Sequence, residues 1–111
     1  DRRSNRLGWG HYLRGHDRTA PPPFAVPARA VSLEGLSPTW IGVGTLDLFH
    51  PEDVAYARRL DEAGVPTELM VVEGGFHGFD NVDADAGISR AFFGSQVRAL
   101  RARFAALGWT R

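Results

Sequence analysis

The chain lacks cysteine, lysine, an excess of charge of either sign and long hydrophobic runs. Without cysteine it has no disulfide bond, no thiolate nucleophile and no zinc–thiolate site, which fits a reducing compartment and predicts a cytoplasmic protein. Thirteen basic residues, all of them arginine, balance thirteen acidic residues, so no net charge attracts nucleic acid or anionic lipid. The apolar runs are far shorter than the roughly 20 residues that a membrane-spanning helix needs, and we expect no membrane span.

Motifs for metals and cofactors are also missing from the sequence. The four histidines show neither the H-x-H nor the H-E-x-x-H spacing that is typical of metal ligands; they are His11, His16, His50 and His77. Gly42 and Gly44 begin a G-x-G pattern, but Asp47 stands where a dinucleotide-binding loop would have its third glycine, and no phosphate-binding P-loop is present. The sequence therefore predicts neither a metal ion nor a cofactor.

The length and composition fit a single soluble domain. The 111 residues are 43% hydrophobic and 23% charged, which is ordinary for a globular protein. We interpret residues 1–38 as a helix and loop segment, because a short, glycine-weakened helix is predicted over 5–14 and prolines keep the chain irregular up to Pro38. Trp9 and Tyr12 in this segment either line a pocket or, as is more common for aromatic residues, pack beneath the loop.

Beyond this segment the sequence alternates between strand and helix patterns. Residues 39–44 form a short apolar run, bounded by proline and glycine, that is typical of a buried strand. A helix is predicted from Pro51 to a stop at Gly64, followed by a second strand over 67–73. A final amphipathic helix begins near Gly87, and we expect its apolar stripe to pack on the sheet. The stripe consists of Phe93, Val97, Leu100, Phe104 and Leu107.

This order of elements predicts an α/β fold in which residues 39–111 form a βαβα unit with a parallel sheet. A parallel sheet of two strands is poorly stable by itself, so at least one of its edges is expected to pair with strands that the chain lacks. The chain also begins at Asp1 and not at methionine, which suggests a piece of a longer protein.

Two polar residues follow the predicted strands, Asp47 after the first and His77 after the second. In a parallel sheet, ligands and catalytic groups collect in the loops at the carboxyl ends of the strands. A carboxylate that binds one imidazole nitrogen fixes the tautomer and leaves the other nitrogen to accept a proton from a nucleophile. The spacing therefore predicts two of the three parts of a hydrolytic triad.

The residues around His77 suit a crowded site. Three glycines would let the loop turn tightly; they are Gly74, Gly75 and Gly78. Phe76 and Phe79 are expected to exclude water from the histidine. From the spacing alone, an alternative is equally well supported, in which Asp47 caps the helix near Pro51 and the histidine merely lies in a turn.

The stretch from Leu36 to Asp80 reads LSPTWIGVGTLDLFHPEDVAYARRLDEAGVPTELMVVEGGFHGFD. Its motifs GTLDLF, AGV and GGFHGF resemble the G-x-x-D-x-L/F, A-G-V and G-x-x-H-G-F motifs of α/β-hydrolases of the hormone-sensitive-lipase-like esterase group. The resemblance implies that Asp47 is the triad acid and His77 the general base of a serine carboxylesterase that acts on small-molecule esters. It also implies a homodimer, because relatives in this group often dimerise through the last strand and helix.

The nucleophile that this resemblance implies is not in the sequence. In that family a G-x-S-x-G elbow and an oxyanion loop precede the acid. None of the five serines has glycines at the required spacing; they are Ser4, Ser32, Ser37, Ser89 and Ser95. We therefore expect residues 1–111 to be the C-terminal part of one α/β-hydrolase domain, inactive without the absent nucleophile-bearing N-terminal part. The alternative is a non-catalytic interaction module, or a truncated relic, that pairs through its sheet edge and last helix.

Overall fold

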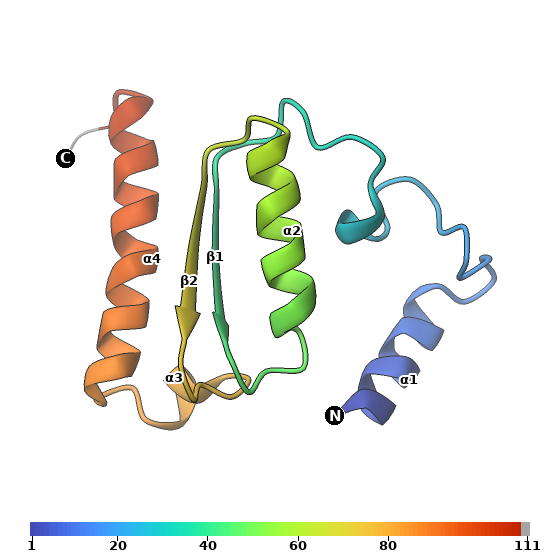
Figure 1. Cartoon of the computed structure of the whole chain (residues 1–111), viewed down its shortest axis with the longest axis horizontal. Helices are drawn as coiled ribbons and strands as arrows, with labels where there is room; N and C mark the ends of the chain where they lie inside the picture. The colour runs from blue at the N-terminus through green and yellow to red at the C-terminus, as the bar shows by residue number, and fades with distance from the viewer. Residues whose placement is uncertain (110–111) are drawn as a thin grey trace.

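The computed structural model describes residues 1–109 and places a two-stranded parallel sheet between helices (Figure 1). The elements are, in chain order, α1 (Arg2–Tyr12), the 3-10 helix η1 (Pro27–Arg29), β1 (Thr39–Gly44), α2 (His50–Glu62), β2 (Thr67–Val72), α3 (Phe79–Val82) and α4 (Gly87–Ala106). The register of β1 and β2 runs from Thr39 opposite Thr67 to Gly44 opposite Val72. The predicted order of strand, helix, strand and helix is confirmed; residues 110–111 of the predicted unit lie outside the described residues.

Helices α2 and α4 cover opposite faces of the sheet (Figure 1). Because side chains alternate along a strand, neighbouring residues of β1 enter different core clusters. The cluster beneath α2 comprises Leu33, Leu60 and Val65, with Ile41 of β1 packed against it. The cluster beneath α4 comprises Val72, Phe79 and Phe92, with Trp40 of β1 packed against it. Helices therefore pack on both faces of the sheet, although Leu69 and Val71 of β2 remain 37% and 43% exposed.

Helix α2 ends in a Schellman motif, as the sequence predicts. Gly64 has a φ of 76°, a left-handed conformation that favours glycine. Its amide donates a hydrogen bond to the carbonyl oxygen of Asp61 at 2.9 Å, and the amide of Val65 donates to the carbonyl oxygen of Leu60 at 3.0 Å. This ending buries Val65 in the first core cluster and turns the chain into β2.

Glycine in β1 allows α4 to approach the sheet closely. A Cβ atom at Gly42 would lie 2.5 Å from Cε2 of Phe92 and 2.1 Å from Cη2 of Trp40. The rings of Trp40 and Phe92 instead meet edge to face, with their centroids 5.3 Å apart. A glycine that would weaken an isolated strand is therefore required here by the packing of two aromatic side chains.

Helix α4 packs on the sheet with a different face from the one predicted. Its buried residues are Ser89, Phe92 and Ser95. The predicted stripe is largely exposed to solvent, with Phe93 at 64% and Leu100 at 58% of full exposure. The helix itself is confirmed, but the prediction that the stripe packs on the sheet is wrong.

A partly buried hydrogen-bond chain explains this choice of face. Ser95 is 2% exposed, and its hydroxyl accepts a hydrogen bond from Nε1 of Trp40 at 2.9 Å and donates one to Oε1 of Glu68 at 3.1 Å. Buried polar groups are tolerated when they are hydrogen-bonded in this way. A hydrophobic pattern does not reveal these contacts, because it counts serine as a surface residue.

The proline-rich segment between α1 and β1 is held on α2 by an arginine. The guanidinium of Arg59 donates hydrogen bonds to the carbonyl oxygens of Ala28 and Ala30, each at 2.5 Å. Leu33, which is 4% exposed, then enters the core beside Leu60 of α2. The predicted irregular conformation up to residue 38 is confirmed, apart from the short helix η1.

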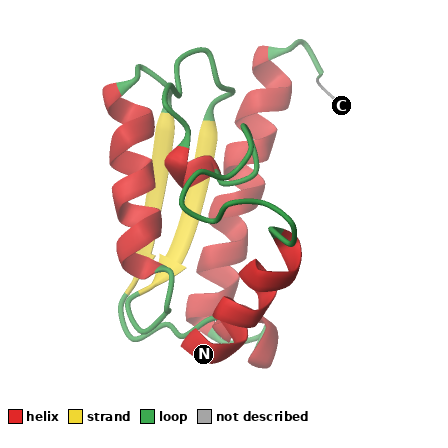
Figure 2. Cartoon of the chain, turned by 90° about the vertical axis from the view of Figure 1, so that its right-hand side faces the viewer, coloured by secondary structure: helices red, strands yellow, loops and turns green. Residues whose placement is uncertain are grey.

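Helix α1 begins earlier than predicted because Asp1 caps it, with its carboxylate accepting a hydrogen bond from the amide of Ser4 at 2.9 Å. None of the residues of α1 is buried. Trp9 and Tyr12 form an edge-to-face pair with ring centroids 5.7 Å apart, and Tyr12 is 63% exposed. The sequence left open whether Trp9 and Tyr12 line a pocket or pack beneath the loop. Because Tyr12 is largely exposed, it does not pack beneath the loop. Figure 2 views the molecule from the side of α1.

Candidate active site

The carboxyl ends of β1 and β2 lead into two loops that hydrogen bonds join side by side. The amide of Thr45 donates to the carbonyl oxygen of Val72, and the amide of Leu46 donates to the carbonyl oxygen of Gly75, each at 2.9 Å. The amide of Gly74 donates to Oγ1 of Thr45, also at 2.9 Å. These hydrogen bonds therefore join the two loops into one platform at the edge of the sheet where catalytic groups collect.

Glycines bring the backbones of these loops into direct contact. A Cβ atom at Gly44 would lie 2.0 Å from the carbonyl oxygen of Gly75, so no other residue fits at Gly44 without moving a loop. Gly74 and Gly78 have φ angles of 71° and 74°, which favour glycine. The prediction that glycines let the histidine loop turn tightly is thus confirmed by the backbone geometry.

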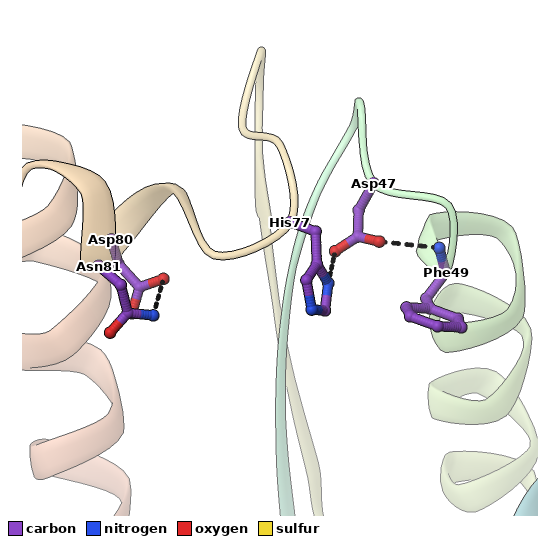
Figure 3. A network of polar contacts seen from close by, with 5 residues as sticks. All are labelled: Asp47, Phe49, His77, Asp80 and Asn81. Carbon is purple, nitrogen blue, oxygen red and sulfur yellow. Dashed lines mark hydrogen bonds and ion pairs between the residues drawn. The ribbon is translucent and has the colours of Figure 1, made fainter. Parts of the chain in front are cut away.

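The structure brings together the side chains of Asp47 and His77, the two residues proposed from the sequence (Figure 3). Nδ1 of His77 lies 2.8 Å from Oδ2 of Asp47. The aspartate side chain is 10% exposed, whereas the histidine side chain is 75% exposed. The carboxylate is therefore enclosed by the loops, while the imidazole stands at the surface with its second nitrogen, Nε2, directed away from the aspartate.

Asp47 also binds the backbone of its own loop. Its second oxygen, Oδ1, accepts a hydrogen bond from the amide of Phe49 at 3.0 Å. This is an Asx turn, in which an aspartate closes onto the residue two positions ahead. Residue Phe49, not Asp47, stands at the N-cap of α2, and no side chain caps this helix. The alternative that Asp47 caps the helix is therefore not what the structure shows.

The environment of Asp47 stabilises its charged form. Burial raises the pKa of this carboxyl, but hydrogen bonds from the amide of Phe49 and from His77, together with the charge of an imidazolium, outweigh burial and hold the pKa below its ordinary value. Asp47 therefore carries a negative charge across the neutral and mildly acidic range, as an acid that orients a histidine must.

The pKa of Asp47 leads to a testable dependence of stability on pH. The pKa of Asp47 is lower in the folded state than in the unfolded state, so the ionised carboxylate stabilises the fold. This stabilisation is complete above the unfolded-state pKa of about 3.9 and is lost as the pH falls through the folded-state pKa. We expect the Asp47→Asn variant to differ from the parent in its free energy of unfolding more at about pH 5 than at about pH 2. Urea unfolding followed by circular dichroism measures both differences, and equal differences would show that the carboxylate gains nothing from folding.

The sequence did not identify Phe49 as part of the site. Its ring meets the imidazole of His77 edge to face, with the centroids 5.7 Å apart and the planes at 67° (Figure 3). Phe49 therefore holds Asp47 through its amide and borders His77 through its ring. The contact of its amide with Asp47 could have been predicted, because an aspartate often forms an Asx turn with the residue two positions ahead. The contact of its ring with His77 depends on how two separate loops meet.

The two phenylalanines near His77 do not both act as predicted. Phe79 is 9% exposed and belongs to the core cluster with Val72 and Phe92, so it anchors the end of the histidine loop. Phe76 is 48% exposed. The expectation that both rings exclude water from the histidine is therefore wrong, because the ring of Phe79 lies in the core and the ring of Phe76 faces solvent.

A further carboxylate, Asp53, lies in the first turn of α2. Burial raises the pKa of Asp53, and the negative charges of Asp47 and Glu52 raise it further.

Within residues 1–109 no group of three or more histidine, aspartate or glutamate side chains is arranged to hold a metal ion. Over the same range, no helix combines the length and the apolar character that crossing a bilayer requires.

This arrangement is able to move a proton. A carboxylate on Nδ1 fixes the proton there, which leaves Nε2 as the basic nitrogen. Neither buried serine of α4 is presented beside this pair, because Ser95 is buried in its contact with Trp40 and Ser89 is buried with its hydroxyl unpaired. The geometry of the pair is therefore one in which a carboxylate orients an imidazole for proton transfer.

The fold and the loop motifs together define the class of the protein. Residues 1–81 match the family described as alpha/beta hydrolase fold, and the chain belongs to this family. This confirms the resemblance to the hormone-sensitive-lipase-like group. Among curated relatives, the carboxylic ester hydrolase LipN of Mycobacterium tuberculosis is 36% identical in an alignment of 98 residues that covers 86% of this chain.

Solved structures of esterases share the fold. The esterase LipW from Mycobacterium marinum superposes with a TM-score of 0.85 at 39% identity over 94% of this chain. A bacterial heroin esterase has a TM-score of 0.62 at 35% identity over 78% of the chain, and the esterase E25 has 0.69 at 31% over 84%. The chain spans 26% of the length of LipN and 32% of the LipW chain.

Proposed function

We propose that Asp47 and His77 are the acid and the base of a serine carboxylic ester hydrolase. The contact of 2.8 Å between Oδ2 and Nδ1 carries the proposal, because it joins a largely enclosed carboxylate to an exposed imidazole at the carboxyl edge of a parallel sheet. Membership of the α/β-hydrolase family, and similarity to proteins that are carboxylic ester hydrolases, support the same function.

In this mechanism Nε2 of His77 takes the proton of a serine hydroxyl as the serine oxygen attacks the ester carbonyl carbon. Asp47 stabilises the resulting imidazolium, which then gives the proton to the oxygen of the leaving alcohol. In the second half of the reaction the same nitrogen takes a proton from water as the water oxygen attacks the acyl carbon. The bond between the acyl carbon and the serine oxygen then breaks, the carboxylic acid leaves, and the imidazolium returns the proton to the serine oxygen. Each step thus uses one proton, which passes through His77.

We infer that the serine and the oxyanion donors come from outside the 111 residues. None of the five serines stands in a G-x-S-x-G sequence, and a site without nucleophile and oxyanion donors does not perform acyl transfer. The substrates that we propose are small, uncharged carboxylic esters with short or medium acyl chains. The location that we propose is the cytoplasm, which the absence of cysteine supports.

The test compares the complete gene product with the isolated 111-residue chain. We expect the complete gene product to hydrolyse p-nitrophenyl butyrate and to lose this activity on treatment with a serine-directed organophosphate. The isolated chain is expected to release p-nitrophenol only at the uncatalysed rate. Organophosphate-sensitive turnover by the isolated chain would contradict the inference about the serine, and no turnover by the complete product would contradict the proposed function.

A second candidate function is an interaction module. The outer edges of β1 and β2 have no strand partner within residues 1–109, and α4 exposes a row of apolar side chains there: Phe93, Leu100, Phe104 and Leu107. Both features suit pairing with another chain, including a homodimer. This function replaces the first if the complete gene product sediments as a dimer and shows no organophosphate-sensitive hydrolysis.

A further inference from the structure

An uncharged hollow shares one residue, Phe49, with the surroundings of the proposed acid–base pair. It has a volume of about 380 Å³ and is lined by Asn5, Gly8, Trp9, Tyr12, Ala25 and Phe49. Residues from α1, from the proline-rich segment and from the loop after β1 therefore form one surface. In both overall views the start of α1 lies at the end of the molecule to which the strand arrows point (Figures 1 and 2).

Phe49 connects this hollow to His77. The same side chain lines the hollow and places its ring edge to face with the imidazole, at a centroid distance of 5.7 Å. A group that fills the hollow thus contacts the same aromatic ring that contacts the proposed base. The amide of Phe49 also holds Asp47, so the hollow and the acid–base pair share one fixed residue.

The lining of the hollow selects for apolar chemistry. Trp9, Tyr12 and Phe49 provide three aromatic rings, and none of the lining residues carries a charge. A second hollow along α1 differs sharply, since five arginines and one histidine surround Leu7 there. The helix therefore presents an aromatic surface toward Phe49 and a cationic surface elsewhere, and only the aromatic surface suits a hydrocarbon group.

We propose that the hollow formed by Trp9, Tyr12 and Phe49 binds the hydrocarbon group of the leaving alcohol of the ester substrate. This inference rests on the proposed function, because it assigns part of the substrate to a subsite of the same catalytic pair. It makes Trp9 and Tyr12 specificity-determining residues for aryl or alkyl alcohol groups.

The assignment to the alcohol follows from the path of the proton. His77 delivers its proton to the leaving oxygen, so that oxygen lies within hydrogen-bond reach of Nε2. The substituent on this oxygen consequently lies on the imidazole side of the ester carbon. The ring of Phe49, which is one wall of the aromatic hollow, contacts the imidazole ring, and from this contact we infer that the hollow lies on the same side.

The experiment measures kcat/KM of the complete gene product by pH-stat titration with two pairs of esters. Ethyl acetate and 2-phenylethyl acetate differ in the alcohol, whereas ethyl acetate and ethyl 3-phenylpropanoate differ in the acyl group. For Trp9→Ala and Tyr12→Ala we expect the preference for 2-phenylethyl over ethyl acetate to fall about 10-fold or more, as loss of an apolar contact predicts. The acyl preference is expected to change by less than about twofold.

Two control variants accompany these substitutions. Leu7→Ala changes the same helix in the arginine-lined hollow and is expected to leave both preferences unchanged. Trp9→Phe keeps an aromatic ring and is expected to retain most of the alcohol preference. Because Tyr12 is 63% exposed, its truncation leaves the fold intact and tests the subsite even if Trp9→Ala unfolds.

The results separate the subsite from the proposed function. If the parent hydrolyses no ester, or if His77→Ala hydrolyses esters as fast as the parent does, the proposed function fails. If His77 is required but Trp9→Ala and Tyr12→Ala keep the alcohol preference, the subsite is wrong and the function stands. Loss of the acyl preference instead of the alcohol preference would also overturn the subsite assignment.

Discussion

Replacement of His77 by alanine is expected to lower kcat/KM of the complete gene product for p-nitrophenyl butyrate by roughly 10,000-fold or more, the scale seen when a triad base is removed. Without the imidazole no group is placed to take the proton of the serine or to return it to the leaving alcohol. Because the side chain is 75% exposed, the substitution opens no core cavity, and the folded structure is expected to persist.

The matched control for this variant is His16→Ala. His16 is exposed, lies in the irregular segment and takes no part in the contact with Asp47. We expect its kcat/KM to equal that of the parent, which would show that loss of a histidine as such does not lower turnover. Equal activity of the His77→Ala variant and the parent would remove His77 from the mechanism.

The second large effect is expected for Asp47→Asn, which should lower kcat by about 10,000-fold. Asparagine has nearly the same shape as aspartate, but it presents no charge to stabilise the imidazolium. Its amide also donates a hydrogen bond to Nδ1, which moves the proton of His77 to Nε2 and leaves no base for the serine. The effect therefore arises from the wrong tautomer of histidine and not from a change in the fold.

Asp53→Asn is the control for loss of a nearby carboxylate. Asp53 lies close enough for the charge of Asp47 to raise its pKa, but its side chain makes no hydrogen bond to His77. We expect less than a roughly 10-fold change in kcat, because the charge that is removed makes no hydrogen bond to His77 and is partly screened by solvent and salt. A loss as large as that for Asp47→Asn would mean that general electrostatics, and not orientation of the histidine, explains the effect.

Local sequence signals were sufficient to predict the sheet and its connections. Proline before β1 and Gly64 after α2 mark boundaries that depend on backbone conformation, which a sequence expresses directly. Once two parallel strands were predicted, Asp47 and His77 had to lie at the same edge of the sheet. Their approach to 2.8 Å follows from this topology and from the glycines that let the two loops touch.

Contacts between separate elements were not predictable in the same way. The sheet-facing side of α4 depends on Ser95 finding a partner in Trp40, 55 positions away, and a hydrophobic pattern contains no such information. The ring of Phe49 against His77, and the hollow that it shares with Trp9, likewise arise only when three distant segments meet. Tertiary packing therefore decides which of several apolar residues become core and which border the site.

The central claim, that Asp47 acts only through His77, is tested most directly by a double-mutant cycle. kcat/KM is measured for the parent, Asp47→Asn, His77→Ala and the double variant with p-nitrophenyl butyrate. If the two residues work as one unit, the double variant has the same activity as His77→Ala, because the carboxylate has no role once the imidazole is gone. If instead the two single losses multiply in the double variant, the residues act independently and the account is contradicted.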